Sequence, residues 1–195
     1  MVCGAMEGGR SPAKAGRPYD DMKTEYLLNR EVEHVLAALT PTNRLVARVC
    51  LHTGLRVSDV LALRREDIGL QFWVTESKTK KRRKVGLPRD LLQEILDSSA
   101  GSVWAFPGRY PEKPHTRQAV WADVKRAAKA FRLPQNVAPH SFRKCFAVEL
   151  RDRCGDMERV QRALNHSSME VTMIYAMADK LLQAKRGRGI IKADH

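Results

Sequence analysis

Apolar residues recur at helical spacing along most of the chain, and one stretch interrupts this pattern with two extended runs. The first predicted helix covers about 26–39, and others follow at about 43–50, 56–63, 116–131, 141–153, 157–164 and 171–184, with one more beginning at Pro88. The β-prone runs at 71–75 and 84–87 flank a basic stretch and predict a hairpin with a basic tip. The sequence therefore predicts an α+β fold that is mainly α-helical, with a small antiparallel β-hairpin.

The 195 residues are enough for one well-packed domain and too few for two ordinary ones. Residues 1–25 begin with a stretch rich in Gly, Ala, Ser and Pro, which predicts a flexible arm. The predicted domain covers 26–184, and residues 185–195 form a basic tail with two glycines. No internal repeat interrupts this order.

The balance of charge favours an anionic partner. Lys and Arg total 35 against 22 Asp and Glu, a net charge of +13. Such a field concentrates a polyanion near the chain, so nucleic acid is the leading partner, and an ordinary basic protein is the alternative. Cys3, Cys50, Cys145 and Cys154 show neither a CxxC pair nor metal-finger spacing, and no secretory or membrane-spanning run accompanies them. We expect a reducing, cytoplasmic compartment.

Two pairs of residues have the spacing and chemistry of a phosphate site. Arg56 and Asp59 are three apart at a helix start, where Asp59 could hold Arg56 or another cation in place; a surface ion pair is the alternative. His140 and Arg143 are also three apart at a predicted helix start after Pro139, where free backbone N–H groups favour an anion. A helix cap with a solvated charge would explain the second pair equally well.

The basic run at residues 78–84 has six cations in seven residues. Such a run is normally a solvated face or a nonspecific grip on a nucleic-acid backbone, and its candidate DNA-binding residues are Lys80, Lys81, Arg82, Arg83 and Lys84. Lys78 is expected at the end of the first strand, where a hairpin could aim its ammonium at a leaving oxygen. Two further candidates, His166 in a predicted loop and Tyr175, would alone be structural residues.

The order of these elements is more specific than any one of them. It runs Thr53-Gly54-Leu55-Arg56-Val57-Ser58-Asp59, Ser77-Lys78-Thr79, His140-Ser141-Phe142-Arg143, Leu164-Asn165-His166-Ser167-Ser168 and Tyr175. Over about residues 28–180 the chain resembles the tyrosine recombinase, or phage integrase, family. The resemblance implies the catalytic-domain fold of that family and an enzyme that cuts and rejoins DNA.

The resemblance also implies a role for each site residue. Arg56 and Arg143 would clamp the scissile phosphate, with His140 and His166 assisting by hydrogen bonds. Lys78 would protonate the 5′-hydroxyl leaving group, although Lys80 remains an alternative. Tyr175 would attack the phosphorus and form a 3′-phosphotyrosyl enzyme. The implied reaction conserves bond energy, so no metal or other cofactor is expected.

The partner implied by the resemblance is double-stranded DNA, bound by a homo-oligomer that forms a tetrameric synapse, and the location is the cytoplasm at the nucleoid. Family members commonly carry a helical domain upstream, so we expect either a natural short form or an excised fragment. Two other functions stay open: a DNA-binding module that has lost turnover, and a type IB topoisomerase.

Overall fold

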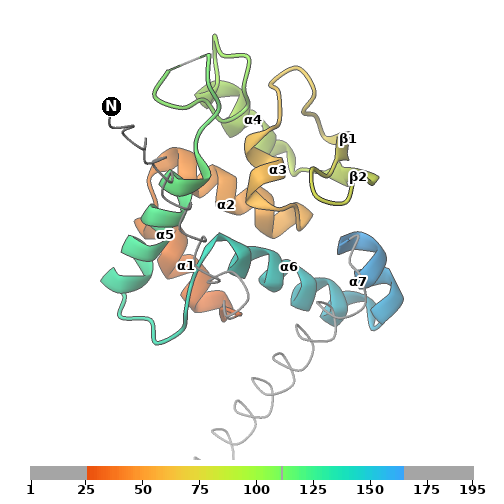
Figure 1. Cartoon of the computed structure of the whole chain (residues 1–195). Coiled ribbons are helices and arrows are strands. Elements are labelled where there is room, and N and C mark those ends of the chain that lie inside the picture. Colours follow the sequence, from red (N-terminus) through yellow and green to blue (C-terminus); the bar gives the residue numbers. More distant parts are fainter. Residues whose placement is uncertain (1–25, 111, 165–195) are drawn as a thin grey trace, which may run out of the picture.

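The computed structural model describes residues 26–110 and 112–164, and within them the chain is mostly helical with one two-stranded sheet (Figure 1). The elements are α1 (Asn29–Ala38), α2 (Pro41–Thr53), α3 (Val57–Leu61), β1 (Gln71–Thr75), β2 (Arg82–Gly86), α4 (Arg89–Ser98), α5 (Arg117–Ala130), α6 (Pro139–Cys154) and α7 (Met157–Leu164). The predicted fold class is confirmed.

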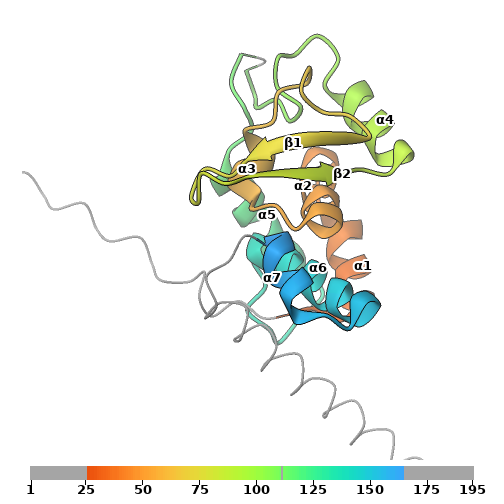
Figure 2. The same ribbon diagram turned by 90° about the vertical axis from the view of Figure 1, so that its right-hand side faces the viewer.

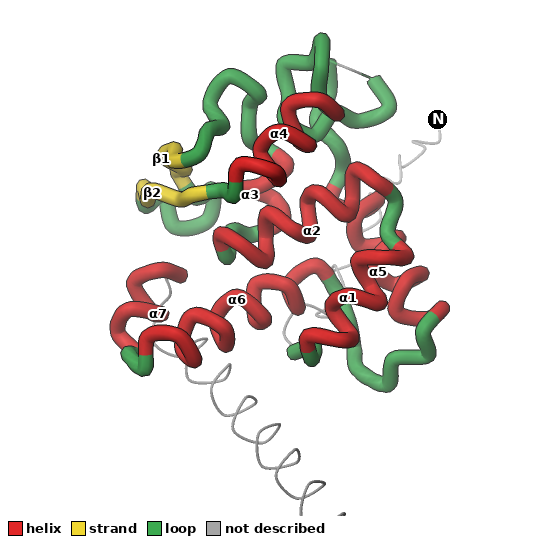
Figure 3. Tube along the Cα trace, turned by 180° about the vertical axis from the view of Figure 1, so that it is seen from behind, coloured by secondary structure: helices red, strands yellow, loops and turns green. Residues whose placement is uncertain are grey.

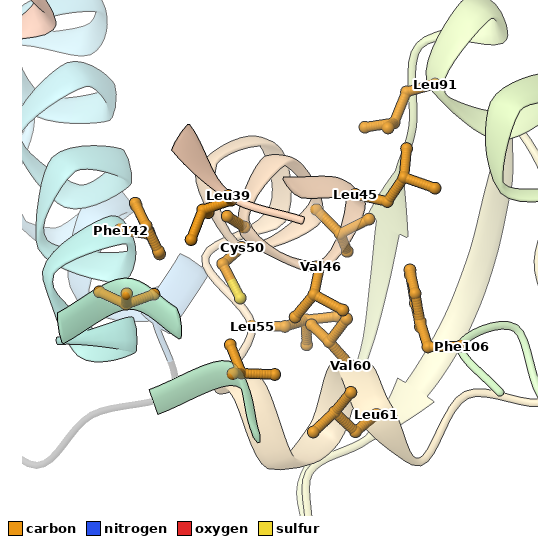
Figure 4. Packing of buried hydrophobic residues seen from close by; sticks show 14 of the residues in the cluster. Leu39, Leu45, Val46, Cys50, Leu55, Val60, Leu61, Leu91, Phe106 and Phe142 are labelled. Atoms are coloured by element: carbon orange, nitrogen blue, oxygen red, sulfur yellow. The ribbon is translucent and has the colours of Figure 1, made fainter. Parts of the chain in front are cut away.

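The core forms around α2. Leu45, Val46 and Val49 of this helix are buried. Figure 4 shows Val46 close to Leu55, just before α3, and to Val60 within α3. Phe142 of α6 and Phe106 of the loop after α4 belong to the same buried cluster. Burial of such side chains supplies most of the free energy of folding, roughly 1.5–3 kcal/mol for each large apolar group.

The hairpin has one face turned to this core. β1 and β2 pair antiparallel, with Phe72 opposite Val85 and Val74 opposite Arg83. Phe72, Val74 and Val85 are buried, whereas their neighbours along β1 are exposed. Since side chains alternate across a strand, the register turns Arg83 inward together with the apolar side chains.

Helix α6 connects the α5 side of the structure with α7. Figures 1 and 3 show that it runs from the side of α5 to α7, and both Figures 1 and 2 show α7 below the hairpin. Gly54, which ends α2, has a left-handed φ of 64°, and a Cβ there would lie 2.3 Å from Cδ1 of Phe146 in α6. Only glycine permits both this turn and the close approach of α6.

The predicted helices are all present in the described part, with shifted ends. The second helix begins at Pro41 rather than at residue 43, because a proline in the first helical turn lacks only an N–H that would have no partner there. β2 begins at Arg82 rather than Lys84, because Arg82 pairs with Thr75 and lengthens the ladder. The helix expected at 171–184 and both terminal segments lie outside the described residues. No helix in the described ranges is long and apolar enough to cross a membrane.

Candidate functional site: an arginine-lined pocket beside the hairpin

A small pocket of about 90 Å³ lies between the start of α3 and the start of α6. Arg56, His140 and Arg143 line it, together with Ser58. Arg56 is the N-cap of α3, and His140 lies in the first turn of α6, which begins one residue earlier at Pro139. The structure thus brings Arg56 together with the predicted His140–Arg143 pair, which is far from it in the sequence, and the resulting site is basic.

Arg143 is the most deeply buried of these cations, with 1% of its surface exposed. Its Nη1 donates to the carbonyl of Gly54 at 2.6 Å, and its Nη2 donates to the carbonyl of Leu164 at 2.6 Å. Burial first, and the neighbouring Arg56 second, lower the pKa of Arg143 to about 10. The two bonds to backbone carbonyls fix the orientation of the guanidinium plane.

Glu76 is a counter-ion of the site, although no sequence pattern singled it out. Its side chain is fully buried just after β1, and Oε2 accepts from Nη1 of Arg56 at 2.6 Å. Its Oε1 lies 3.2 Å from Nε of Arg83. Burial alone raises the pKa of Glu76, but the charges of Arg143, Arg83 and Arg56 and the hydrogen bond from Arg56 outweigh it, so the pKa is lowered.

The predicted pairing of Arg56 with Asp59 is therefore corrected. Arg56 pairs with Glu76, and Asp59, which is buried, accepts at Oδ1 from the backbone N–H of Ser77 at 3.0 Å and from its hydroxyl at 2.6 Å. Asp59 supports the site by a different route from the one expected, because it fixes the start of the hairpin turn rather than an arginine.

Lys78 lies in that turn, exposed, three residues beyond the end of β1 rather than on the strand. Its two neighbours are both anchored, Ser77 to Asp59 and Thr79 through its hydroxyl to Glu76 at 3.1 Å. Lys80 has a left-handed φ of 57° and its backbone N–H donates to the carbonyl of Glu76. The turn is thus held at both ends by carboxylates of the site.

The basic run does not form one solvated face. Lys80, Lys81, Arg82 and Lys84 are exposed as expected. The expectation is wrong for Arg83, whose side chain is 12% exposed and donates from Nη2 to the carbonyl of Thr53 and from Nη1 to that of Ala163. Its place opposite Val74 on the inner face of the hairpin is the reason.

Two residues of α5, Arg117 and Trp121, also line the pocket and were not predicted. Both are exposed, and Nζ of Lys125 lies 5.5 Å from the centre of the Trp121 ring. Their spacing of four residues on one helix was the available signal. His166 and Tyr175 lie outside the described residues. In residues 26–110 and 112–164, no group of three or more His, Cys, Asp or Glu residues could hold a metal ion.

Comparison with known proteins identifies the family of this chain. Residues 25–181 match the phage integrase family. The chain belongs to the phage integrase family. A probable integrase/recombinase of Bacillus subtilis (strain 168), YoeC, is 34% identical over 135 residues, which cover 67% of this chain and 74% of the relative.

Two further relatives are matched over only about half of their length. The integrase of Escherichia phage P2 is 32% identical over 173 residues, which are 86% of this chain and 48% of the relative. Tyrosine recombinase XerA of Thermococcus kodakarensis is 31% identical over 162 residues, covering 76% of this chain and 56% of the relative. The chain thus spans about half the length of these two integrase-family relatives.

Solved structures show the same fold. XerH recombinase in a post-cleavage complex with its difH substrate superposes with a TM-score of 0.66 at 23% identity, over 85% of this chain and 53% of that one. A lambda integrase dimer bound to a core site gives a TM-score of 0.64 at 22% identity, over 77% of this chain and 47% of that one. The integrase-family fold is therefore established for the described part of this chain.

Proposed function

We propose that this chain is the catalytic domain, at residues 26–184, of a site-specific tyrosine recombinase that cuts and rejoins DNA through a 3′-phosphotyrosyl intermediate. The observation that carries the proposal is the convergence of Arg56, His140 and Arg143 on one pocket. Membership of the integrase family gives that pocket its reaction class.

The pocket suits a phosphodiester in the transition state of transfer. Negative charge grows on the non-bridging oxygens as the phosphorus becomes five-coordinate, and fixed cations stabilise it most when they are already in place. Arg143 is held by two carbonyls and Arg56 by Glu76, so neither guanidinium has to be ordered when DNA binds. His140, in the first turn of α6, would add a hydrogen bond to the same phosphate.

The proposed reaction exchanges one phosphate ester for another. The Tyr175 oxygen forms a bond to phosphorus, the bond to the 5′ oxygen breaks, and the leaving oxygen takes a proton from Lys78. The phenol proton passes to a base or to water. A 5′-hydroxyl of another strand reverses the step, so bond energy is conserved and neither metal nor ATP is required. Lys78 is preferred to Lys80 because both of its neighbours are anchored to site carboxylates.

Double-stranded DNA is the proposed partner. The net charge of +13 favours it, and solved relatives include a XerH–difH complex and a lambda integrase dimer on its core site. The exposed cations Lys81, Arg82 and Lys84 would contact the DNA backbone. We further propose that the active assembly on DNA is a tetramer of this chain, and that the protein acts in the cytoplasm at the nucleoid.

The test is a covalent-capture experiment. End-labelled duplexes with nicks at random positions are incubated with the protein without metal or ATP and run on a denaturing gel beside Tyr175→Phe. We expect a labelled protein band that the variant lacks, with DNA binding nearly unchanged in the variant. A covalent band that persists in Tyr175→Phe would remove the nucleophile assignment.

Two alternatives predict other outcomes of the same experiment. A DNA-binding module without turnover would bind the duplexes and form no covalent band in either protein. A type IB topoisomerase would form the band and relax supercoiled plasmid without exchanging strands between two sites. Sequencing of the trapped DNA identifies the target site if the band forms.

A further inference from the structure

Glu76 occupies an unusual position for an acidic residue in a basic site. It has none of its surface exposed, and the charges of three arginines lower its pKa. Two of them, Arg56 and Arg83, form ion pairs with it. A carboxylate buried in this way is costly unless cations and hydrogen bonds compensate it, and here two ion pairs and the hydroxyl of Thr79 do so.

The contacts of Glu76 connect the arginine pocket with the hairpin turn that carries Lys78. Its carboxylate accepts from Arg56, which lines the pocket, and from the hydroxyl of Thr79 in the hairpin turn. Its backbone N–H donates to the carbonyl of Lys81, and its own carbonyl accepts from the N–H of Lys80. The same residue therefore orients a pocket arginine and closes the turn that carries Lys78.

The charges of the site also favour a positioning role for Glu76. Arg143 and Arg56 lie near enough for Arg56 to lower the pKa of Arg143, so the cations repel one another in the absence of an anion. Glu76 offsets this repulsion before DNA arrives, while Arg56 still borders the pocket. A neutral side chain at residue 76 would leave the cations attractive to DNA but less well ordered.

We propose that Glu76 is a positioning residue for strand cleavage, which holds the Arg56 guanidinium at the pocket and fixes the Lys78 turn relative to it. This inference rests on the proposed recombinase function. Glu76 does not itself contact the phosphate. Its contribution is to the geometry of the cation and of the proposed general acid, so its loss lowers the rate of cleavage more than the affinity for DNA.

The experiment measures covalent-complex formation under single-turnover conditions, with duplex affinity measured separately, for Glu76→Gln and Glu76→Asp. We expect Glu76→Gln to cleave roughly 10- to 100-fold more slowly, the loss typical of residues that orient a functional group from behind. Its affinity for duplex DNA stays equal or rises, since one negative charge is removed. Glu94→Gln is the matched control, because Glu94 pairs with Arg48 on the exposed surface away from the pocket.

The order of the two variants separates positioning by charge from packing. Gln keeps the shape of Glu but not its charge, whereas Asp keeps the charge on a shorter side chain. Positioning by charge predicts that Glu76→Asp cleaves faster than Glu76→Gln. A role in packing alone predicts the reverse order, and that order would overturn the proposal.

The remaining outcomes are also decisive. If Glu76→Gln does not fold, Glu76→Asp is compared with Glu94→Asp: slower cleavage at unchanged affinity supports the proposal, and wild-type cleavage overturns it. A wild type that forms the covalent complex beside an equally fast Glu76→Gln overturns only the inference about Glu76. A wild type that binds DNA and forms no complex overturns the proposed function and this inference with it.

Discussion

Arg82 and Arg83 are neighbours in one strand and lie in opposite environments. Arg82 is exposed, and its guanidinium lies 5.0 Å from the centre of the Trp73 ring on the outer face. Arg83 faces inward, pairs with Glu76 and donates to the carbonyls of Thr53 and Ala163. The alternation of the strand, and not residue type, decides which cation organises the protein and which remains for a partner.

The same division holds for the whole site. The inner set of cations, which includes Arg83 and Arg143, is fixed by hydrogen bonds and ion pairs within the protein. Burial lowers the pKa of both arginines. The outer cations at Lys81, Arg82 and Lys84 face solvent, where salt screens their charge. The inner set should therefore control cleavage and stability, and the outer set should control the salt dependence of DNA binding.

The largest effect is expected at the inner set. Arg143→Lys keeps a positive charge but loses the planar fork that holds the carbonyls of Gly54 and Leu164. We expect cleavage to fall about 100- to 1,000-fold, the cost of removing one preorganised donor to a transition state. Single-turnover cleavage measures this, with Arg48→Lys as a surface control. A loss of cleavage rate no greater than that of Arg48→Lys would contradict the role of Arg143 at the scissile phosphate.

The two neighbouring arginines allow a matched test of stability. Arg83→Gln leaves Glu76 short of one partner and breaks bonds to two carbonyls, so we expect unfolding to become about 2–4 kcal/mol easier. Arg82→Gln should change the free energy of unfolding by less than about 0.5 kcal/mol, as is usual at exposed positions. Denaturant unfolding measures both, and equal effects would break the comparison.

Asp123 extends the comparison to a buried charge outside the pocket. It accepts hydrogen bonds from Thr40, Asn43 and Arg126, and these outweigh burial to lower its pKa from 3.8 to about 2. The ionised Asp123 therefore stabilises the folded state by about 2 kcal/mol above pH 4. This contribution is lost as the pH falls through the pKa of Asp123 in the folded protein. Asp123→Asn should be less stable at pH 7 and lose less stability than wild type between pH 4 and pH 2, measured by thermal unfolding.

The smallest effect is expected at the outer set. Lys81→Gln removes one exposed cation at the end of the hairpin turn. We expect the slope of log affinity against log salt to fall by about one, with cleavage at saturating DNA unchanged. Fluorescence titration over a salt series measures the slope. A loss of cleavage at saturating DNA would instead place Lys81 in the inner set.

Sequence reasoning predicted the helices of the described part and the meeting of Arg56 with His140 and Arg143 at one site, because each rests on local spacing or on the family's motif order. It missed Glu76, because an ion pair between residues 56 and 76 depends on how the hairpin packs against α3. It also placed Arg83 in solvent, because the inward face of a strand follows from register and cannot be seen in a run of like charges. Both features depend on how the hairpin packs against the rest of the fold, which local sequence patterns do not encode.

The most direct test of the central claim is the chemical site of DNA attachment. The covalent complex is digested with nuclease and trypsin, and the peptide that carries the residual nucleotide is identified by mass spectrometry. We predict that the added mass lies on Tyr175, within the peptide from Ala163 to Lys180. Attachment at another tyrosine, such as Tyr26 or Tyr110, would contradict the recombinase mechanism proposed for this chain.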